Sequence, residues 1–291
     1  MRNELFNLTF RRFVRHRMAL AGLVVLTTII ILVAGAPFFS TGDPFKQNLR
    51  NRFQPPSATA IMGTDDLGRD MWTRVLYGGR ISLTVGLLAM GVSIVVGATV
   101  GLLSGFYGGW VDSILSRITE IFLSIPRLFV LIAMGMVLRT AEVPFLKAGS
   151  FAPIAIVIGV LSWMGVARLV RGATLELRER EYVQAARAIG ATNARIMFRH
   201  ILPNVFSPII VSATLGLAGA IISESGLSYL GFGVQLPTPT WGNMLSNTQN
   251  QITTAPWTVI FPGLAIFIIV IAINYIGDGL RDALDPRHFT K

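Results

Sequence analysis

Cysteine and charged side chains are what this sequence has least of. None of its 291 residues is cysteine, which excludes disulfides, thiolate catalysis and cysteine-ligated metals. Charged residues make up 14% of the chain, against about 25% in an ordinary soluble domain. Because backbone groups find no water inside a bilayer, long uncharged stretches indicate membrane-spanning helices. The composition therefore predicts an integral membrane protein.

Motifs for enzyme chemistry are also missing. The three histidines are His16, His200 and His288; no H-E-x-x-H occurs, and no pair of acids lies within a predicted span, so hydrolysis lacks its groups. No G-x-x-x-x-G-K-[ST] loop is present, so we expect no nucleotide, metal or other cofactor in this chain. The stretch GTDDLGRD (63–70) lacks the spacing of a calcium loop, and we interpret it as a structural or partner-contacting turn.

Six stretches are long and apolar enough to predict an all-α protein with six transmembrane helices. The first, 18–39, is too long for the apolar core of a signal peptide, about 7–15 residues. The third is the shortest, because only 128–138 is uncharged; the amphipathic residues before it predict one long helix, kinked near Pro126. Glycines in the second, among them Gly86 and Gly97, suit close helix packing but are also common in spans. The other spans lie within 81–110 and at 148–167, 201–223 and 257–276.

Basic residues are distributed unequally between the two sides of these spans. The segments 1–17, 111–127, 168–200 and 277–291 hold 17 of the 25 Lys and Arg, and the opposite segments hold 8. This asymmetry predicts both termini in the cytoplasm. It also explains the net charge of +10 without nucleic acid as a partner.

The longest predicted cytoplasmic connection contains a helix, a break and a second helix. Apolar and small residues from Tyr182 to Ile189 fall at helical spacing, and Gly190 can end that helix. Thr192 can cap the second helix, which we expect Pro203 to stop. Small side chains at the centre of this hairpin let another protein's surface approach closely, and its arginines favour an anionic partner.

The hairpin resembles the cytoplasmic signature loop of permeases in binding-protein-dependent ABC importers. That signature reads Glu-Ala-Ala, three residues, Gly, nine residues, Ile, one residue, Leu-Pro. The chain matches it with Ala185, Ala186, Gly190 and Leu202-Pro203, and departs from it with Gln184 in place of Glu and His200 in place of Ile. The resemblance implies that these seven residues form a coupling loop that docks on an ATPase subunit.

Three further segments resemble the dipeptide, oligopeptide and nickel permeases, specifically the second permease with its extra N-terminal span. They are GTDDLGRD with the following RVLYGGRISL, 235–242, and 277–287. The resemblance implies a type I ABC importer permease (MetI-like) fold, with an N-terminal segment at 1–80 and a transmembrane domain at 81–291 that carries the coupling loop at 171–204. The implied partners are a second homologous permease, two cytoplasmic ATPase subunits that bind ATP and Mg, and an external binding protein in a bacterial inner membrane. The implied cargo is a di- or oligopeptide; nickel or glutathione stay open.

Two ionisable residues in the spans allow an alternative reading. An ion-coupled carrier would normally show several such residues, and we find Glu224 and Arg127. Glu224 could line the passage or be a structural acid bonded to Ser223, Ser225 or Ser228, with the structural role slightly favoured. For Arg127 we favour a side chain that snorkels to the interface.

Overall fold

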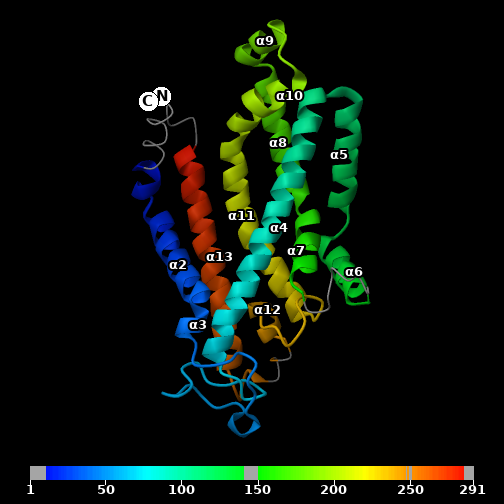
Figure 1. The fold of residues 1–291 in the computed structure, drawn as a ribbon. Helices are drawn as coiled ribbons and strands as arrows, with labels where there is room; N and C mark the ends of the chain where they lie inside the picture. The colour runs from blue at the N-terminus through cyan, green and yellow to red at the C-terminus, as the bar shows by residue number, and fades with distance from the viewer. Residues whose placement is uncertain (1–10, 141–149, 247, 249–250, 285–291) are drawn as a thin grey trace.

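The computed structural model describes residues 11–140, 150–246, 248 and 251–284. Within these ranges the chain is helical, with one isolated bridge between Thr64 and Asp70. The long helices lie side by side in an elongated bundle (Figure 1). Helices α9 (Glu181–Ala188) and α10 (Asn193–Ile196) lie at one end, and α3 (Ala36–Phe39) and α12 (Trp241–Met244) at the other. We call these the α9 end and the α12 end.

Four helical stretches are long and apolar enough to cross a membrane unbroken. They are α2 (Arg17–Ala34), α4 (Met71–Tyr107), α13 (Trp257–Leu284) and the continuous run Asn193–Tyr229. Two bent pairs pass the same test together: α5 (Gly109–Ser124) with α6 (Arg127–Thr140), and α7 (Ala152–Val160) with α8 (Trp163–Arg178). Counting each pair as one span gives the six predicted from the sequence.

The third span differs from the expected kinked helix. Helices α5 and α6 are separate and meet at 85°. Ile125, which precedes Pro126, is extended (φ −89°, ψ 128°), because the proline ring disfavours helical backbone in the residue before it. The expectation of one long helix was wrong, and α5 instead packs against α4 and α8.

The second span begins earlier than its uncharged run. Helix α4 starts at Met71 and is capped by Asp70, whose Oδ2 accepts from the Thr73 N–H at 2.8 Å. Its first turns include Arg74, which is 2% exposed because it pairs with Asp65 at 3.4 Å and donates to the Pro44 carbonyl at 3.2 Å. The search for uncharged runs could not predict that α4 begins at Met71, because its first turns contain Arg74. The helix crosses residue 80, and the division into 1–80 and 81–291 stays a prediction.

The fifth span shows that Pro203 does not stop a helix, contrary to our expectation. α10 continues through a π-helical turn, η2 (Met197–Ile201), into α11 (Leu202–Tyr229), which has Pro203 in its first turn. A π turn is wider than an α turn and changes the hydrogen-bond register, so the proline ring fits where its missing N–H is not needed. The Asn204 side chain donates to the His200 carbonyl at 2.6 Å and satisfies a group near this junction.

Glycines on α4 allow close contacts with neighbouring helices. A Cβ at Gly97 would lie 2.6 Å from the Trp163 carbonyl oxygen, and one at Gly101 would lie 2.4 Å from that of Ala167. Gly86 is also close to Ile221 of α11, where a Cβ would be 2.8 Å away. These contacts confirm the close-packing interpretation of Gly86 and Gly97, because larger side chains would push the helices apart.

The GTDDLGRD stretch forms a hydrogen-bonded turn at the α12 end. Oδ1 of Asp65 accepts from the Leu67 and Arg69 N–H groups, each at 2.9 Å, and Oδ2 pairs with Arg69 Nε at 2.7 Å. Gly63 and Gly68 have φ values of 73° and 68°, in the left-handed region that favours glycine. Asp65 therefore stabilises the turn itself, and Asp70 caps the helix that follows it, in agreement with the structural interpretation.

Candidate functional site

The candidate coupling loop is built as the sequence predicted around Gly190 and Thr192. Helix α9 ends at Ala188, and Gly190 follows with φ 83°. Thr192 caps α10 by accepting from the Arg195 N–H at 3.3 Å. The hairpin therefore turns at a glycine and restarts at a threonine, which fixes the angle between the two short helices.

One face of the hairpin packs inside the chain. Val183 and Ile196 are fully buried, and Ala186 is 6% exposed. They belong to a hydrophobic cluster that also contains Leu102 and Phe106 of α4. The Ala186 side chain therefore packs within this chain, so it does not lie on the outer face with its neighbour Ala185.

The opposite face of the hairpin is open. Gln184, Ala185, Gly190 and Pro203 are exposed, and His200 and Leu202 are half-buried. The most exposed apolar side chain of the hairpin is Ile189, at 87%. The seven residues singled out by the motif thus divide into an exposed set, a half-buried pair and the buried Ala186.

Gln184 has a role that explains why an amide suits this position. Its Nε2 donates to the Arg178 carbonyl at 3.1 Å, at the end of α8. The last carbonyls of a helix lack partners within the helix, so a side-chain donor there stabilises the α8–α9 junction. An ionised glutamate has no hydrogen to donate, so the departure from the family motif has a local structural reason.

A bidentate ion pair holds α8, which leads into the loop. Asp112 of α5 accepts from Arg171 of α8 at 2.6 Å and 2.7 Å, and Ser104 of α4 donates to the same carboxylate. Arg178 then donates to the Gly105 carbonyl at 3.1 Å. Sequence reasoning missed this cluster, because no helical spacing relates residues 59 positions apart.

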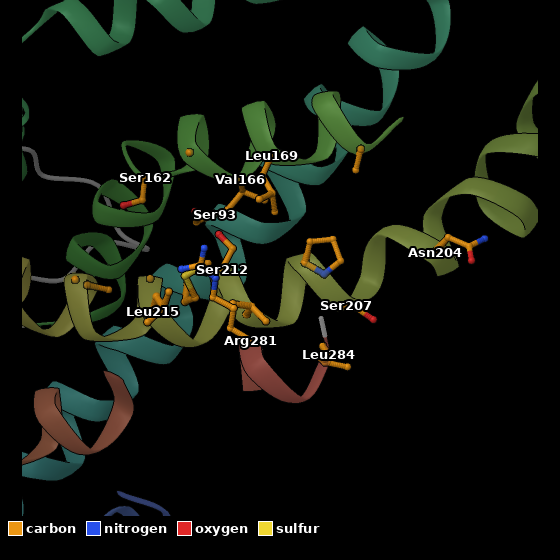
Figure 2. Close-up of a pocket in the computed structure, with 18 of the residues that line it drawn as sticks. Ser93, Ser162, Val166, Leu169, Asn204, Ser207, Ser212, Leu215, Arg281 and Leu284 are labelled. Atoms are coloured by element: carbon orange, nitrogen blue, oxygen red, sulfur yellow. The ribbon is translucent and has the colours of Figure 1, made fainter. Parts of the chain in front are cut away.

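A cavity of about 980 Å³ opens beside this loop. In Figure 2, Val166 and Leu169 of α8 lie across from Ser207, Ser212 and Leu215 of α11. The end of α13 contributes further wall residues near the α9 end. The wall is mainly apolar with interspersed hydroxyls, which is typical of small-molecule passages and pockets.

Arg127 lines this cavity, contrary to the snorkelling interpretation. Its Nη2 donates to the hydroxyl oxygen of Ser162 at 2.7 Å, across the gap between α6 and α7. The 85° bend after α5 turns the start of α6 inward, which a straight third span would not do. The sequence identified the ionisable residue, but its direction depends on the bend.

Glu224 is placed in a hydrogen-bond network and not in the cavity wall. Its side chain is 0% exposed and accepts from Ser82 at 2.9 Å and Ser228 at 2.7 Å. Ser225 lies at 3.5 Å, at the limit of a hydrogen bond. The structural role of Glu224 is therefore favoured over the pathway role, although Ser82, a partner on α4, was not predicted.

Two family models match this chain, and together they cover most of its length. Residues 97–289 match the family described as "Binding-protein-dependent transport system inner membrane component". Residues 4–56 match the "N-terminal TM domain of oligopeptide transport permease C".

Individual relatives cover nearly the whole chain. The dipeptide transport system permease protein DppC of Alkalihalophilus pseudofirmus is 45% identical over 96% of this chain and 88% of its own length. The oligopeptide permease OppC of Bacillus subtilis is 40% identical over 95% of this chain and 88% of its own. The glutathione permease GsiD of Pectobacterium atrosepticum is 39% identical over 96% and 90%.

Among solved structures, the inward-facing MetNI methionine ABC transporter matches with a TM-score of 0.59 at 21% identity. The match covers 74% of this chain and 98% of that chain. It supports a type I ABC importer permease fold. With these matches, the chain belongs to the family of inner-membrane permease subunits of binding-protein-dependent transport systems.

Proposed function

We propose that this chain imports di- or oligopeptides as one of two homologous permeases in an ATP-driven transporter of a bacterial inner membrane. The observation that carries the proposal is the pairing of an exposed hairpin at the α9 end with a cavity of about 980 Å³ beside it. In this proposal an external binding protein delivers the cargo, and two cytoplasmic ATPase subunits bind ATP and Mg. The chain itself is non-catalytic.

The hairpin supports the coupling role through its two faces. Its inner face packs on α4 and α11 through a hydrophobic cluster, so a displacement of the hairpin is transmitted to the cavity walls. Its outer face presents Gln184, Ala185 and Gly190 with the apolar Ile189 beside them. An exposed apolar side chain surrounded by small and polar residues is typical of a docking anchor.

The peptide cargo is supported by the relatives and by the cavity. Dipeptide and oligopeptide permeases match over nearly the full chain at 40–45% identity. The wall combines apolar surface with hydroxyls and arginines, which suits a zwitterionic backbone with varied side chains. The glutathione permease among the relatives makes that tripeptide the second candidate.

Topology is the first test. The basic-residue asymmetry predicts that both termini and the hairpin lie in the cytoplasm. Because the chain has no cysteine, a cysteine introduced at Ser57 should react from outside with an impermeant reagent, and one at Thr192 should not. Both positions are exposed in the structure. The reverse labelling pattern would overturn the orientation.

Coupling is the second test. Gly190→Asp places a charge on the docking face and a β-carbon in a left-handed turn, at a backbone cost of about 1 kcal/mol. The variant should insert normally but lose binding-protein-stimulated ATP hydrolysis in the assembled transporter. The purified chain alone should hydrolyse no ATP; hydrolysis by it, abolished by a point mutation within it, would end the permease assignment.

A further inference from the structure

The charges that line the cavity are unbalanced. Arg127, Arg180 and Arg281 line it together with a single acid, Glu176. That acid is already used, because Arg180 pairs with it at 2.5 Å. Among the residues that the structure describes, the cavity wall therefore carries an excess of positive charge, which favours anionic groups over cations.

Among the charged residues that line the cavity, Arg127 has a buried side-chain nitrogen with unused hydrogen-bonding capacity. Its Nη2 donates to Ser162, whose own hydroxyl donates to the Ile158 carbonyl, so Ser162 holds the guanidinium in one orientation. Its Nε is buried and has no partner within the part of the chain described. The same is true of the hydroxyl of Ser93, which also lines the cavity. Buried donors are rarely left unpaired, so these two indicate an acceptor that comes and goes.

A carboxylate is the acceptor that matches this site. A guanidinium presents parallel N–H groups that fit the two oxygens of a carboxylate, and it remains charged under all ordinary conditions. A cationic residue at this depth is costly unless it faces water or a counter-ion, so its place on a cavity wall indicates a role in the passage.

We propose that Arg127, oriented by Ser162, binds the C-terminal carboxylate of the peptide as it passes through the permease. The proposal deepens the proposed function and depends on it. Arg127 makes the contact with the cargo, and Ser162 is a positioning residue. In an otherwise largely apolar passage, this contact selects for a free peptide C-terminus whatever side chains the peptide carries.

The test uses the assembled transporter with its binding protein, reconstituted in vesicles. Two probes are compared: a dipeptide with a free C-terminus and the same dipeptide as its C-terminal amide, each at a concentration that saturates the binding protein. Arg127→Met should lower uptake of the free dipeptide about tenfold, as expected for loss of one charge-assisted hydrogen bond. Binding-protein-stimulated ATP hydrolysis should stay within about twofold of wild type, because the hairpin is untouched.

Other variants separate charge from structure. Arg127→Lys should retain most of the uptake, and Ser162→Ala should lower it less than Arg127→Met does. Arg117→Met, at an exposed arginine on α5 outside the cavity, is the matched control and should transport normally.

Each other outcome is decisive. Wild-type uptake by Arg127→Met, or an equal loss for the dipeptide and its amide, would overturn the carboxylate contact. If Arg127→Met fails to assemble, the comparison of the dipeptide with its amide passes to Ser162→Ala, and an equal loss for both probes in that variant would overturn the contact. If the wild-type complex shows no ATP-driven peptide uptake, the proposed function fails before this proposal is reached.

Discussion

The two ends of the bundle are held together by different forces. At the α12 end, polar side chains join segments that are far apart in the sequence. Trp241 Nε1 donates to the Val75 carbonyl at 2.9 Å, and Trp257 Nε1 donates to that of Thr64 at 3.0 Å. Glu224 joins α11 to α4 through Ser82. These partners are separated by 142 to 193 residues.

The α9 end depends mainly on apolar packing of neighbouring segments. Val183, Ile196 and Ile201 are fully buried in one cluster, while Ile189 nearby is 87% exposed. Hydrogen bonds between buried polar groups are directional, so those at the α12 end favour one arrangement, whereas an apolar contact is less directional. The comparison indicates that the α12 end is the fixed part of the chain and that the α9 end is suited to being moved by a partner.

The α9 end also depends on the close packing of α8 against α4. A substitution at Gly101, which lies at that contact, tests how much this packing contributes to stability. In Gly101→Leu the new Cβ would lie 2.4 Å from the Ala167 carbonyl oxygen, so α4 and α8 must separate. We expect a loss of about 3 kcal/mol, enough to abolish a monodisperse peak in detergent chromatography. Gly91→Leu, on the same helix with nothing within 4 Å of its Cβ, is the control and should behave as wild type. Equal yields of both variants would contradict the close contact.

Glu224 tests the fixed end directly. Glu224→Ala removes the acceptor for Ser82 and Ser228 and leaves a hole among buried hydroxyls. We expect a loss of about 2 kcal/mol, read as a lower thermal unfolding midpoint of the purified protein. Glu224→Gln keeps an acceptor oxygen and the volume, and should lose less than half as much. If Glu224→Gln lowered the unfolding midpoint as much as Glu224→Ala, the explanation by a retained acceptor oxygen and side-chain volume would be wrong.

The sequence was a good guide to elements and a poor guide to where they bend. Uncharged runs and local capping residues were enough for the helical class, for the turn at Gly190 and for the cap at Thr192, because each depends on a few adjacent residues. A kink was correctly expected near Pro126, but the separation into two helices was not, and Pro203 was wrongly expected to stop a helix. Proline follows the end of one helix at Pro126 but lies in the first turn of another at Pro203. The π turn before Pro203 has no clear local sequence pattern.

The candidate site shows the same limit. The motif identified the hairpin, but it did not distinguish the buried Ala186 from the exposed Ala185, which requires knowing what covers the helix. Arg127 was recognised as unusual, yet its direction follows from an 85° bend between two helices. Ser82 and Arg171, which bond to Glu224 and Asp112, lie on other helices, so only a three-dimensional arrangement brings these pairs together.

The Asp112–Arg171 pair sharpens the comparison, because it is a polar contact near the apolar α9 end. Asp112→Asn removes the charge that accepts both Arg171 donors, and we expect a loss of about 1 kcal/mol. Glu120→Gln breaks a neighbouring pair with Arg117 on the same helix; both of its side chains are mostly exposed, so its effect should be close to zero. Thermal unfolding in detergent measures both. A Glu120→Gln loss as large as that of Asp112→Asn would contradict the special role of the half-buried Asp112–Arg171 pair.

Ile189 should affect coupling while leaving stability unchanged. Its side chain is 87% exposed, so Ile189→Ser removes almost no packing within the chain, and the unfolding midpoint should not move. If the side chain is the apolar anchor of the hairpin, the loss of its contact should lower the affinity for the ATPase subunits about tenfold, since burying a large aliphatic side chain contributes about 1.5–3 kcal/mol. Titration of purified ATPase subunits against the permease complex measures this directly. Ile61→Ser, which removes an exposed isoleucine at the α12 end, should leave that affinity unchanged. Equal affinities for all three proteins would place the docking contact elsewhere on the α9 end, and the functional division between the two ends would lose its main support.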